Sequence, residues 1–234
     1  MTTVAPPRLF APAPELVPVL GDRGLFSGLE PLVYANHAGI SPHSILIKKA
    51  VDTLMLDYGR RGAAAYPTWA AQRTRLREKL AALVGASSDE IAFTQNTTRG
   101  VSDIALSIDW KRGDRVLVFR GEFPSNVTPW QRAAELFGLE IVMLESDELR
   151  TDQARALDRI RDAAKAGLRL VAVSAVEFAT GHRVPLRAIS EIAKAAGALV
   201  FVDAVQACGL TPIDVGQAGV DFLACGSHKL LMGM

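Results

Sequence analysis

The sequence is poor in cysteine, has almost no net charge and contains no long hydrophobic run. Its two cysteines, Cys208 and Cys225, stand among apolar residues, which predicts buried thiols in a reducing compartment. With 26 Lys and Arg against 25 Asp and Glu, the net charge of +1 gives no reason to expect nucleic acid or an anionic membrane as a partner. No apolar run approaches the ~20 residues of a membrane-spanning helix, and the Pro/Ala-rich N-terminus lacks the pattern of a signal peptide. We therefore expect a cytoplasmic protein.

The sequence also lacks G-x-G-x-x-G and G-x-x-x-x-G-K-[ST], the two commonest phosphate loops of nucleotide-binding α/β domains. Short apolar segments nevertheless alternate with amphipathic ones. The expected strands cover residues 91–94, 115–120, 140–144, 168–176, 199–202 and 222–225, and the expected helices cover residues 44–58, 68–84, 97–108, 126–137, 151–166 and 186–196. This alternation predicts an α/β fold with three α/β/α layers and a mainly parallel sheet.

The length and composition predict one domain. At 49% hydrophobic, the 234 residues can bury one large core but are too few for two full-sized domains. Residues 1–31 are rich in Pro and Gly, which is typical of an irregular arm. The expected domain therefore covers residues 32–234.

An acid and an amine follow the last two expected strands. Asp203 comes directly after an apolar run, where an unpaired buried carboxylate would be costly. Lys229 follows the next strand after the short segment Gly226-Ser227-His228. In open parallel sheets the ligand site lies beyond the carboxyl ends of the strands. We expect Asp203 and Lys229 to meet there.

These residues resemble the cofactor site of class V aminotransferases, the fold-type I pyridoxal-phosphate (PLP) enzymes that include cysteine desulfurases. The matching segments are Asp203-Ala-Val-Gln206-Ala and Ser227-His228-Lys229, and their separation fits the family spacing. The resemblance implies that Asp203 pairs with the pyridine nitrogen of PLP and that Gln206 meets the ring hydroxyl. It implies that Lys229 attaches to the cofactor through an imine and moves the Cα proton of an amino-acid substrate.

A phosphate site is expected at the start of the helix predicted at residues 97–108. The free N–H groups and the helix dipole attract anions there, and Thr97 and Thr98 add hydroxyl donors. Ordinary N-capping by Asn96 or Thr97 is the alternative. In the family a Thr pair binds the phosphate at this place, with Ser227 and His228 closing from the other side.

The chain departs from the family pattern beside the lysine. Many desulfurases read Ser-Gly-His-Lys, whereas this chain reads Gly226-Ser227-His228-Lys229, so the serine has moved by one position. Because of this shift, the sequence supports a phosphate contact by Ser227 less well than it supports one by the Thr pair.

Three further segments match the family more loosely. Phe123 stands where the family has a ring, often His, that stacks on the pyridine; phenyl can stack but cannot carry a proton. Glu177 is the nearest match to the residue that reaches the ring oxygen, and it is expected to be protonated there or to face the substrate. His37 and Asn126 are candidate substrate contacts, with a turn residue as the alternative for His37.

The resemblance also predicts that the chain is incomplete. In the family the Arg that binds the substrate carboxylate and the catalytic Cys of desulfurases follow the lysine. A seventh, antiparallel strand fits between the strands expected here at residues 91–94 and 222–225. The sequence ends at Met234. We therefore expect a PLP-binding large domain with part of its sheet missing, and we expect the C-terminal small domain to be missing as well.

Three functions remain open at this point. The first is a homodimeric, metal-free PLP enzyme acting on an amino acid by transamination, epimerisation or cysteine desulfuration/β-elimination. The second is a truncated, non-catalytic protein of the same fold. The third is a nucleotide-binding α/β domain, against which the missing phosphate loops argue.

Overall fold

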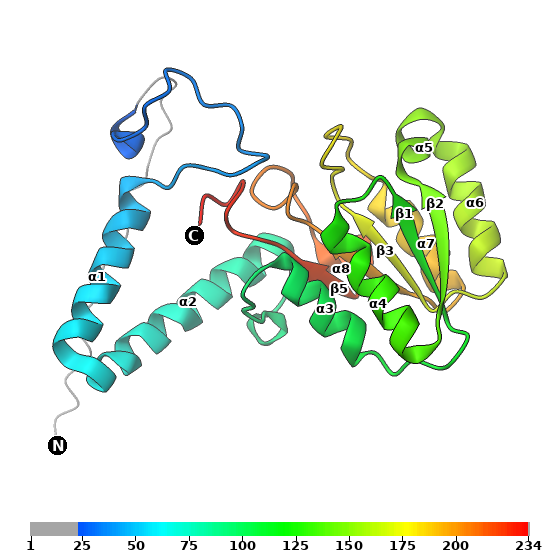
Figure 1. Ribbon diagram of the computed structural model, residues 1–234, viewed down its shortest axis with the longest axis horizontal. Coiled ribbons are helices and arrows are strands. Elements are labelled where there is room, and N and C mark those ends of the chain that lie inside the picture. Colours follow the sequence, from blue (N-terminus) through cyan, green and yellow to red (C-terminus); the bar gives the residue numbers. More distant parts are fainter. Residues whose placement is uncertain (1–22, 234) are drawn as a thin grey trace.

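A five-stranded parallel sheet forms the centre of the computed structural model, which describes residues 23–233 (Figure 1). The strands are β1 (Arg115–Arg120), β2 (Glu140–Glu145), β3 (Leu170–Ser174), β4 (Leu199–Asp203) and β5 (Phe222–Ala224). Their order is β2-β1-β3-β4-β5, and every neighbouring pair is parallel. All five residues of β3 are buried, as expected for a strand covered on both faces.

Helices connect the strands and precede them. The longer ones are α1 (Ile45–Arg61), α2 (Tyr66–Val84), α3 (Thr97–Ser107), α4 (Thr128–Phe137), α6 (Gln153–Lys165) and α7 (Leu186–Ala195), and the short ones are α5 (Ser146–Thr151) and α8 (Val215–Ala218). Helices α3 and α4 lie on one face of the sheet, and α6 and α7 lie on the other (Figure 1). The fold is therefore an α/β fold of three layers, as the sequence predicts.

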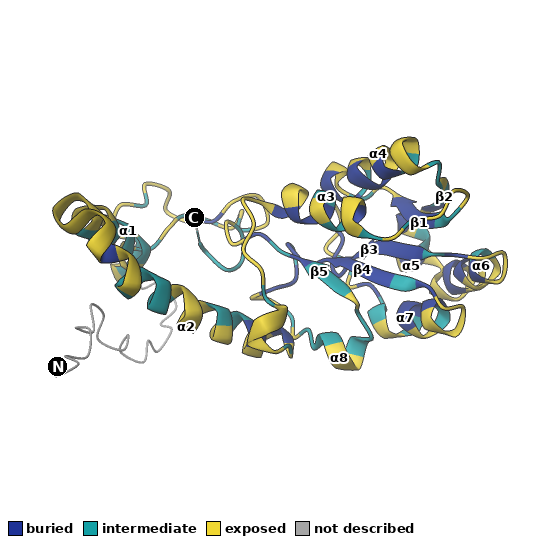
Figure 2. Cartoon of the chain, turned by 90° about the horizontal axis from the view of Figure 1, so that it is seen from below, coloured by how far each residue is buried: buried dark blue, intermediate teal, exposed yellow. Residues whose placement is uncertain are grey.

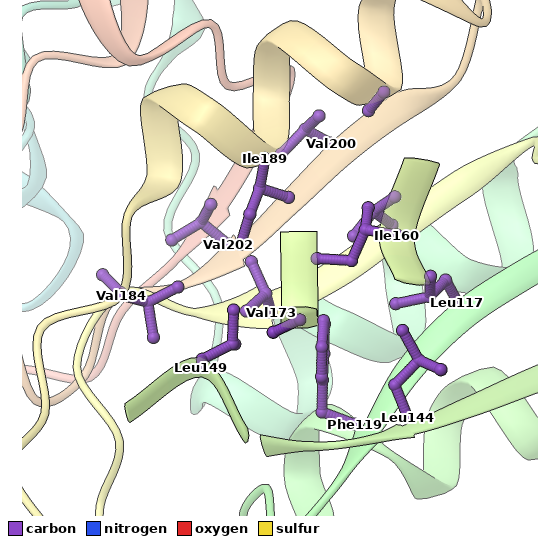
Figure 3. Close-up of a cluster of buried hydrophobic side chains, with 14 of the residues drawn as sticks. Leu117, Phe119, Leu144, Leu149, Ile160, Val173, Val184, Ile189, Val200 and Val202 are labelled. Atoms are coloured by element: carbon purple, nitrogen blue, oxygen red, sulfur yellow. The ribbon is translucent and has the colours of Figure 1, made fainter. Parts of the chain in front are cut away.

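Alternate residues of the strands face the two helical layers. Val118 of β1 belongs to an apolar cluster with Trp130 of α4. Its neighbour Phe119 belongs to a second cluster, which includes Ile160 of α6 and Ile189 of α7 (Figure 3). This period of two is the geometry of a pleated strand, and it buries apolar side chains on both faces. The core holds the strands rigid, and their carboxyl ends carry the loops described below.

Helices α1 and α2 project from the sheet as an arm (Figure 2). No residue of α1 is buried, and the buried residues of α2 are Ala81 and Val84, near its end. The two helices join through the 3₁₀ turn Gly62–Ala65. Met55 is 69% exposed and Leu56 is 53% exposed. The arm therefore presents apolar side chains that the described part of this chain does not cover.

The strand expected at residues 91–94 is wrong. The segment carries no strand pairing, and Phe93 is 41% exposed. A strand persists when a neighbour satisfies its backbone N–H and C=O groups. Among residues 23–233 no strand lies beside this segment, so it has no ladder to join. The apolar pattern favours a strand, but a strand also needs a neighbouring strand to pair with, and the pattern does not show whether one is present.

Several helix boundaries also differ from the prediction. The sequence predicts that α1 ends before Gly59, but the helix runs through Gly59 to Arg61 and ends at Gly62, which has φ 54°. The helix expected from residue 151 begins at Gln153, because the Asp152 side chain accepts from the backbone N–H of Arg155 and caps it. The separate helix α5 precedes it. Of the irregular arm expected at residues 1–31, residues 1–22 lie outside the described part of the chain, and residues 23–31 contain a short 3₁₀ turn, Gly24–Phe26. Met234 at the other end of the chain also lies outside the described part.

Candidate active site

Asp203 ends β4, and Lys229 follows β5 after a short segment, near enough for its amine to act on the Asp203 carboxyl. Asp203 is the last residue of β4 and is 6% exposed, and it lies beside Ala224 of β5 in the sheet register. Burial raises the pKa of the Asp203 carboxyl, while a hydrogen bond from the Val205 backbone N–H (3.0 Å) and the nearby Lys229 amine oppose part of that rise. The Lys229 amine therefore acts electrostatically on a buried carboxyl at this edge of the sheet.

Glu122 is a second, partly buried acid near Asp203, and sequence reasoning assigned it no role. Its Oε1 accepts from the backbone N–H of Ser174 at 2.6 Å, and its Oε2 accepts from the Ser174 hydroxyl. Ser174 lies opposite Asp203 in the β3–β4 register. Burial raises the pKa of the Glu122 carboxyl; the bonds from Ser174 lower it in part, and the Asp203 charge raises it further. Glu122 thus links the loop after β1 to the end of β3.

An aromatic pair stands over the lysine. The Nζ atom of Lys229 lies 5.6 Å from the centre of the Phe123 ring, within the range of a cation–π contact. Phe178 meets Phe123 edge to face, with ring centres 5.3 Å apart. Both rings are nearly half exposed, at 47% for Phe123 and 43% for Phe178. Phe123 therefore presents an accessible ring beside the amine, and Phe178, which sequence reasoning missed, fixes its tilt.

The N-terminus of α3 approaches the segment that carries Lys229. Thr97 is 8% exposed, and its hydroxyl has no hydrogen-bond partner among the described residues. A Cβ placed on Gly226 would lie 3.0 Å from that hydroxyl and 2.8 Å from the His228 ring, so these three residues converge. Asn96 caps α3 by accepting from the Arg99 N–H at 2.8 Å.

The cap and the phosphate donor expected at this helix start are therefore compatible, because Asn96 is the cap and Thr97 remains available. A buried hydroxyl without a partner is costly, and an anion at the helix N-terminus would satisfy it. Thr98 and Ser227 are exposed next to these residues in the chain. The donor set fits a phosphate group.

The segment before α1 crosses the site. The Gln206 side-chain amide donates to the carbonyl of Ala38 at 3.0 Å, and the Ser41 backbone N–H donates to the carbonyl of His228 at 2.9 Å. The His37 ring nitrogen Nδ1 lies 2.8 Å from the Ser41 hydroxyl. Ala38 and Ser41 thus connect the loop after β4 with the segment after β5. His37 is joined to this connection through the Ser41 hydroxyl.

Glu177 and Asn126 are engaged with other parts of the protein. Both oxygens of Glu177 accept hydrogen bonds from hydroxyl groups, Oε1 from Ser146 at 2.6 Å and Oε2 from Thr180. The bond from Ser146 joins the segments that follow β2 and β3, and the bond from Thr180 lies within the loop after β3. Asn126 is fully buried, and its Oδ1 accepts from the indole N–H of Trp130 at 3.4 Å. Their observed partners are thus parts of the protein scaffold.

Two classes of feature are absent from residues 23–233. That part of the chain holds no group of three or more His, Cys, Asp or Glu side chains arranged to bind a metal ion. It also holds no helix with the length and apolarity needed to span a membrane.

The chain is similar in sequence and fold to known proteins. Residues 59–233 match the family model of the class V aminotransferases. A probable cysteine desulfurase of Methanothermobacter thermautotrophicus is 34% identical over 207 residues, covering 86% of this chain and 50% of that protein. A probable cysteine desulfurase of Halalkalibacterium halodurans is 31% identical over the same shares, 86% and 50%.

Solved structures give the same result. The apo structure of a cysteine desulfurase from Thermococcus onnurineus has a TM-score of 0.74 at 31% identity and covers 85% of this chain and 50% of its own. A lysine-to-alanine mutant of C-DES, with glycine covalently linked to its PLP cofactor, has a TM-score of 0.81 at 25% identity, with shares of 89% and 56%.

The chain belongs to the class V aminotransferase family, a family of PLP-dependent enzymes. This contradicts the alternative of an unrelated nucleotide-binding domain. The chain spans about half the length of the relatives it matches.

Proposed function

We propose that this chain is the PLP-binding large domain, over residues 32–234, of an enzyme that acts on an amino acid. The observation that carries the proposal is the buried Asp203 carboxyl at the end of β4, with the Lys229 amine near enough to offset part of the rise in its pKa. Family membership supports it, and so does the cofactor named for the C-DES structure.

Each site residue has a proposed task. When bound, PLP supplies an electron sink for the bond that breaks at the substrate Cα. Asp203 keeps a proton on the pyridine nitrogen, because a nearby carboxylate favours the charged ring. Lys229 is the attachment point and the base that moves the Cα proton. Thr97, Thr98, Ser227 and His228 would hold the phosphate, Phe123 would hold the ring face, and Gln206 would meet the ring hydroxyl.

The looser candidates take supporting roles in the proposal. His37 lines the substrate entrance, because it lies on the segment that crosses the site. Glu177 and Asn126 fix the loops around the cofactor through the bonds they already make with Ser146, Thr180 and Trp130.

The reaction branch is transamination, epimerisation or cysteine desulfuration/β-elimination. The named relatives are cysteine desulfurases. Phe123 favours the first two branches, because a phenyl ring cannot carry the proton that a stacking His would carry. A non-catalytic protein of the same fold is the second candidate.

We also propose a cytoplasmic homodimer. Both cysteines are free thiols, in line with a reducing compartment. The arm exposes a set of large apolar side chains that a second copy would cover: Ile45, Leu46, Met55, Leu56, Tyr58, Tyr66, Leu76 and Leu83.

Covalent labelling tests the proposal directly. The protein is purified with PLP, reduced with borohydride and mapped by peptide mass spectrometry. We expect the phosphopyridoxyl group on Lys229, no label in Lys229→Ala, and normal labelling in Lys165→Ala, a control on the exposed surface of α6. A label on another lysine in the wild-type protein would refute the assignment.

A further inference from the structure

The pairing between β1 and β3 stops well before their carboxyl ends. β3 pairs with β4 along its whole length, from Leu170 to Ser174, but it pairs with β1 only through Leu170 and Val171. β1 itself continues beside β2 as far as Arg120. The order of the strands also reverses between β1 and β3, and in open α/β sheets such a point is where ligands bind.

The Glu122 side chain bridges these two strand ends. Glu122 is the second residue after β1, and Ser174 is the last residue of β3. The Glu122 Oε1 atom accepts from the Ser174 backbone N–H at 2.6 Å, and its Oε2 atom accepts from the Ser174 hydroxyl. A side-chain carboxyl therefore satisfies a backbone group of β3 in the region where the pairing with β1 has ended.

The loop after β1 is held on both sides of Phe123. Gly121 has φ 97°, and a Cβ at this position would collide with the Ser146 hydroxyl. The Asn126 backbone N–H donates to the Phe123 carbonyl at 2.8 Å, and the fully buried Asn126 side chain accepts from the Trp130 indole. The backbone that carries the Phe123 ring is therefore fixed by contacts at three successive places, of which the Glu122 bridge is the nearest to the ring.

The same dipeptide, Glu-Phe, follows both β1 and β3. In Glu122-Phe123 and in Glu177-Phe178, hydroxyl groups hold the Glu carboxyl, while the Phe ring is nearly half exposed. The two rings meet edge to face, with their centres 5.3 Å apart. Each glutamate is thus an anchor beside a ring that faces outward, and the two rings support each other.

We propose that Glu122 is a positioning residue, which holds the Phe123 ring over the Lys229 amine by bridging β1 and β3 through Ser174. The Lys229 Nζ atom lies 5.6 Å from the centre of that ring. Glu122 acts through its neighbour in the chain and through the end of β3. Its importance for the cofactor rests on the proposed function, in which Phe123 holds the ring face of PLP, but the position of the ring can be tested without PLP.

The first experiment measures the reactivity of Lys229 in cofactor-free protein. A ring over the amine shields one side of it, so Phe123→Ala should raise the rate of acetylation by limiting acetic anhydride about twofold to fivefold. Glu122→Ala should raise the rate by the same factor. The double variant should be no faster than either single variant, because both changes remove the same contact. Peptide mass mapping gives the rates, with exposed Lys165 as the reference in each sample.

The conservative variant Glu122→Gln separates positioning from a general loss of structure. A glutamine can accept from the Ser174 N–H through its oxygen and donate to the Ser174 hydroxyl through its amide, so both bonds can persist. Lys229 should then react at the wild-type rate, as it should in the control Glu135→Ala on the surface of α4. An unchanged rate in Glu122→Ala would overturn the proposal, and so would a double variant in which the two effects multiply.

The second experiment uses PLP and distinguishes this proposal from the proposed function. In an absorbance titration, Glu122→Ala should weaken PLP binding by about the same factor as Phe123→Ala, and Glu122→Gln should restore it. A wild-type protein that binds no PLP would contradict the proposed function, while the acetylation rates would still decide the position of the ring. If the wild-type protein binds PLP and Glu122→Ala binds it equally well, Glu122 does not position Phe123 for the cofactor.

Discussion

Asp203, at the end of β4, is buried and Glu122, in the loop after β1, is partly buried; the Lys229 amine acts on the Asp203 carboxyl. A buried charge without a partner costs several kcal/mol. The Lys229 amine offsets part of the rise in the pKa of Asp203, whereas the groups that hydrogen-bond to Glu122, on Ser174 and Asn126, are neutral. We therefore expect Glu122 to keep its proton to a higher pH than an exposed glutamate does.

This expectation gives a pH-dependent stability. Because the pKa of Glu122 is raised on folding, the folded state binds more protons than the unfolded state between the ordinary and the raised value. The free energy of unfolding should therefore fall as pH rises from about 4.3 through the raised pKa. Glu122→Gln should flatten this fall, measured by urea unfolding at a series of pH values.

The control for this series is Glu135→Gln on α4, where the side chain is exposed. It should leave the pH dependence as in the wild type. If Glu122→Gln and the wild type show parallel curves, the Glu122 carboxyl is not protonated on folding.

Thr97 gives a prediction with opposite signs for stability and binding. Its buried hydroxyl lacks a partner among the described residues, so Thr97→Val should raise the free energy of unfolding of the cofactor-free protein by about 1 kcal/mol. The same change should weaken PLP binding, because a phosphate donor is lost. Urea unfolding and a PLP absorbance titration measure the two effects.

Exposed Thr98 is the comparison for Thr97. Thr98→Val should change the stability of the cofactor-free protein by less than about 0.5 kcal/mol. If Thr97→Val destabilises the cofactor-free protein and leaves PLP affinity unchanged, the hydroxyl is not a ligand donor.

The sequence allowed some of these residues to be predicted and not others. Asp203 and Lys229 follow apolar strands, and the ends of parallel strands meet at one edge, so their proximity could be expected. Glu122 could not be assigned, because its burial depends on Ser174 from a strand far along the chain. Likewise, nothing in the sequence shows that the oxygens of Glu177 bond to Ser146 and Thr180.

At the level of elements, the bounds of the strongly apolar strands β1 and β4 were predicted within one residue. The strand predicted at residues 91–94 was wrong. β1, β3 and β4 are buried by helices on both faces, which the run of apolar residues encodes directly. A strand near an edge depends on a neighbour, and this dependence is not written in its own residues. The end of α1 was misplaced for a related reason, since glycine permits a helix stop without requiring one.

The end of α1 offers a matched pair of substitutions. Gly59 lies inside the helix with open space where a Cβ would go, so Gly59→Ala should raise the free energy of unfolding by about 0.5–1 kcal/mol. Gly62 has φ 54° and ψ −132°, which other residues rarely adopt, so Gly62→Ala should lower it by about 1 kcal/mol or more. Urea unfolding followed by far-UV circular dichroism measures both. Equal effects of the two substitutions would mean that the helix does not end at Gly62 in solution.

At the level of the whole molecule, the projecting arm is the main surface without a covering layer among the described residues (Figure 2). Leu56 on α1 and Leu136 on α4 are similarly exposed, at 53% and 52%. If the arm is the dimer contact, Leu56→Asp should weaken dimerisation by at least about tenfold, or ~1.4 kcal/mol, and Leu136→Asp should not. Analytical ultracentrifugation over a concentration series checks both. A wild-type protein that is monomeric throughout would contradict the homodimer.

The order of the strands along the chain and in the sheet also affects how the site forms during synthesis. β1 and β2 are neighbours in both sequence and sheet, so they can pair as soon as β2 has followed α4 from the ribosome. β3 and β4 must then be added in turn on the other side of β1, and β5 comes last. Pairings between distant segments form slowly, because a long loop has to close first. Lys229 follows β5, so the lysine proposed to hold the cofactor is synthesised only after the described strands and Asp203.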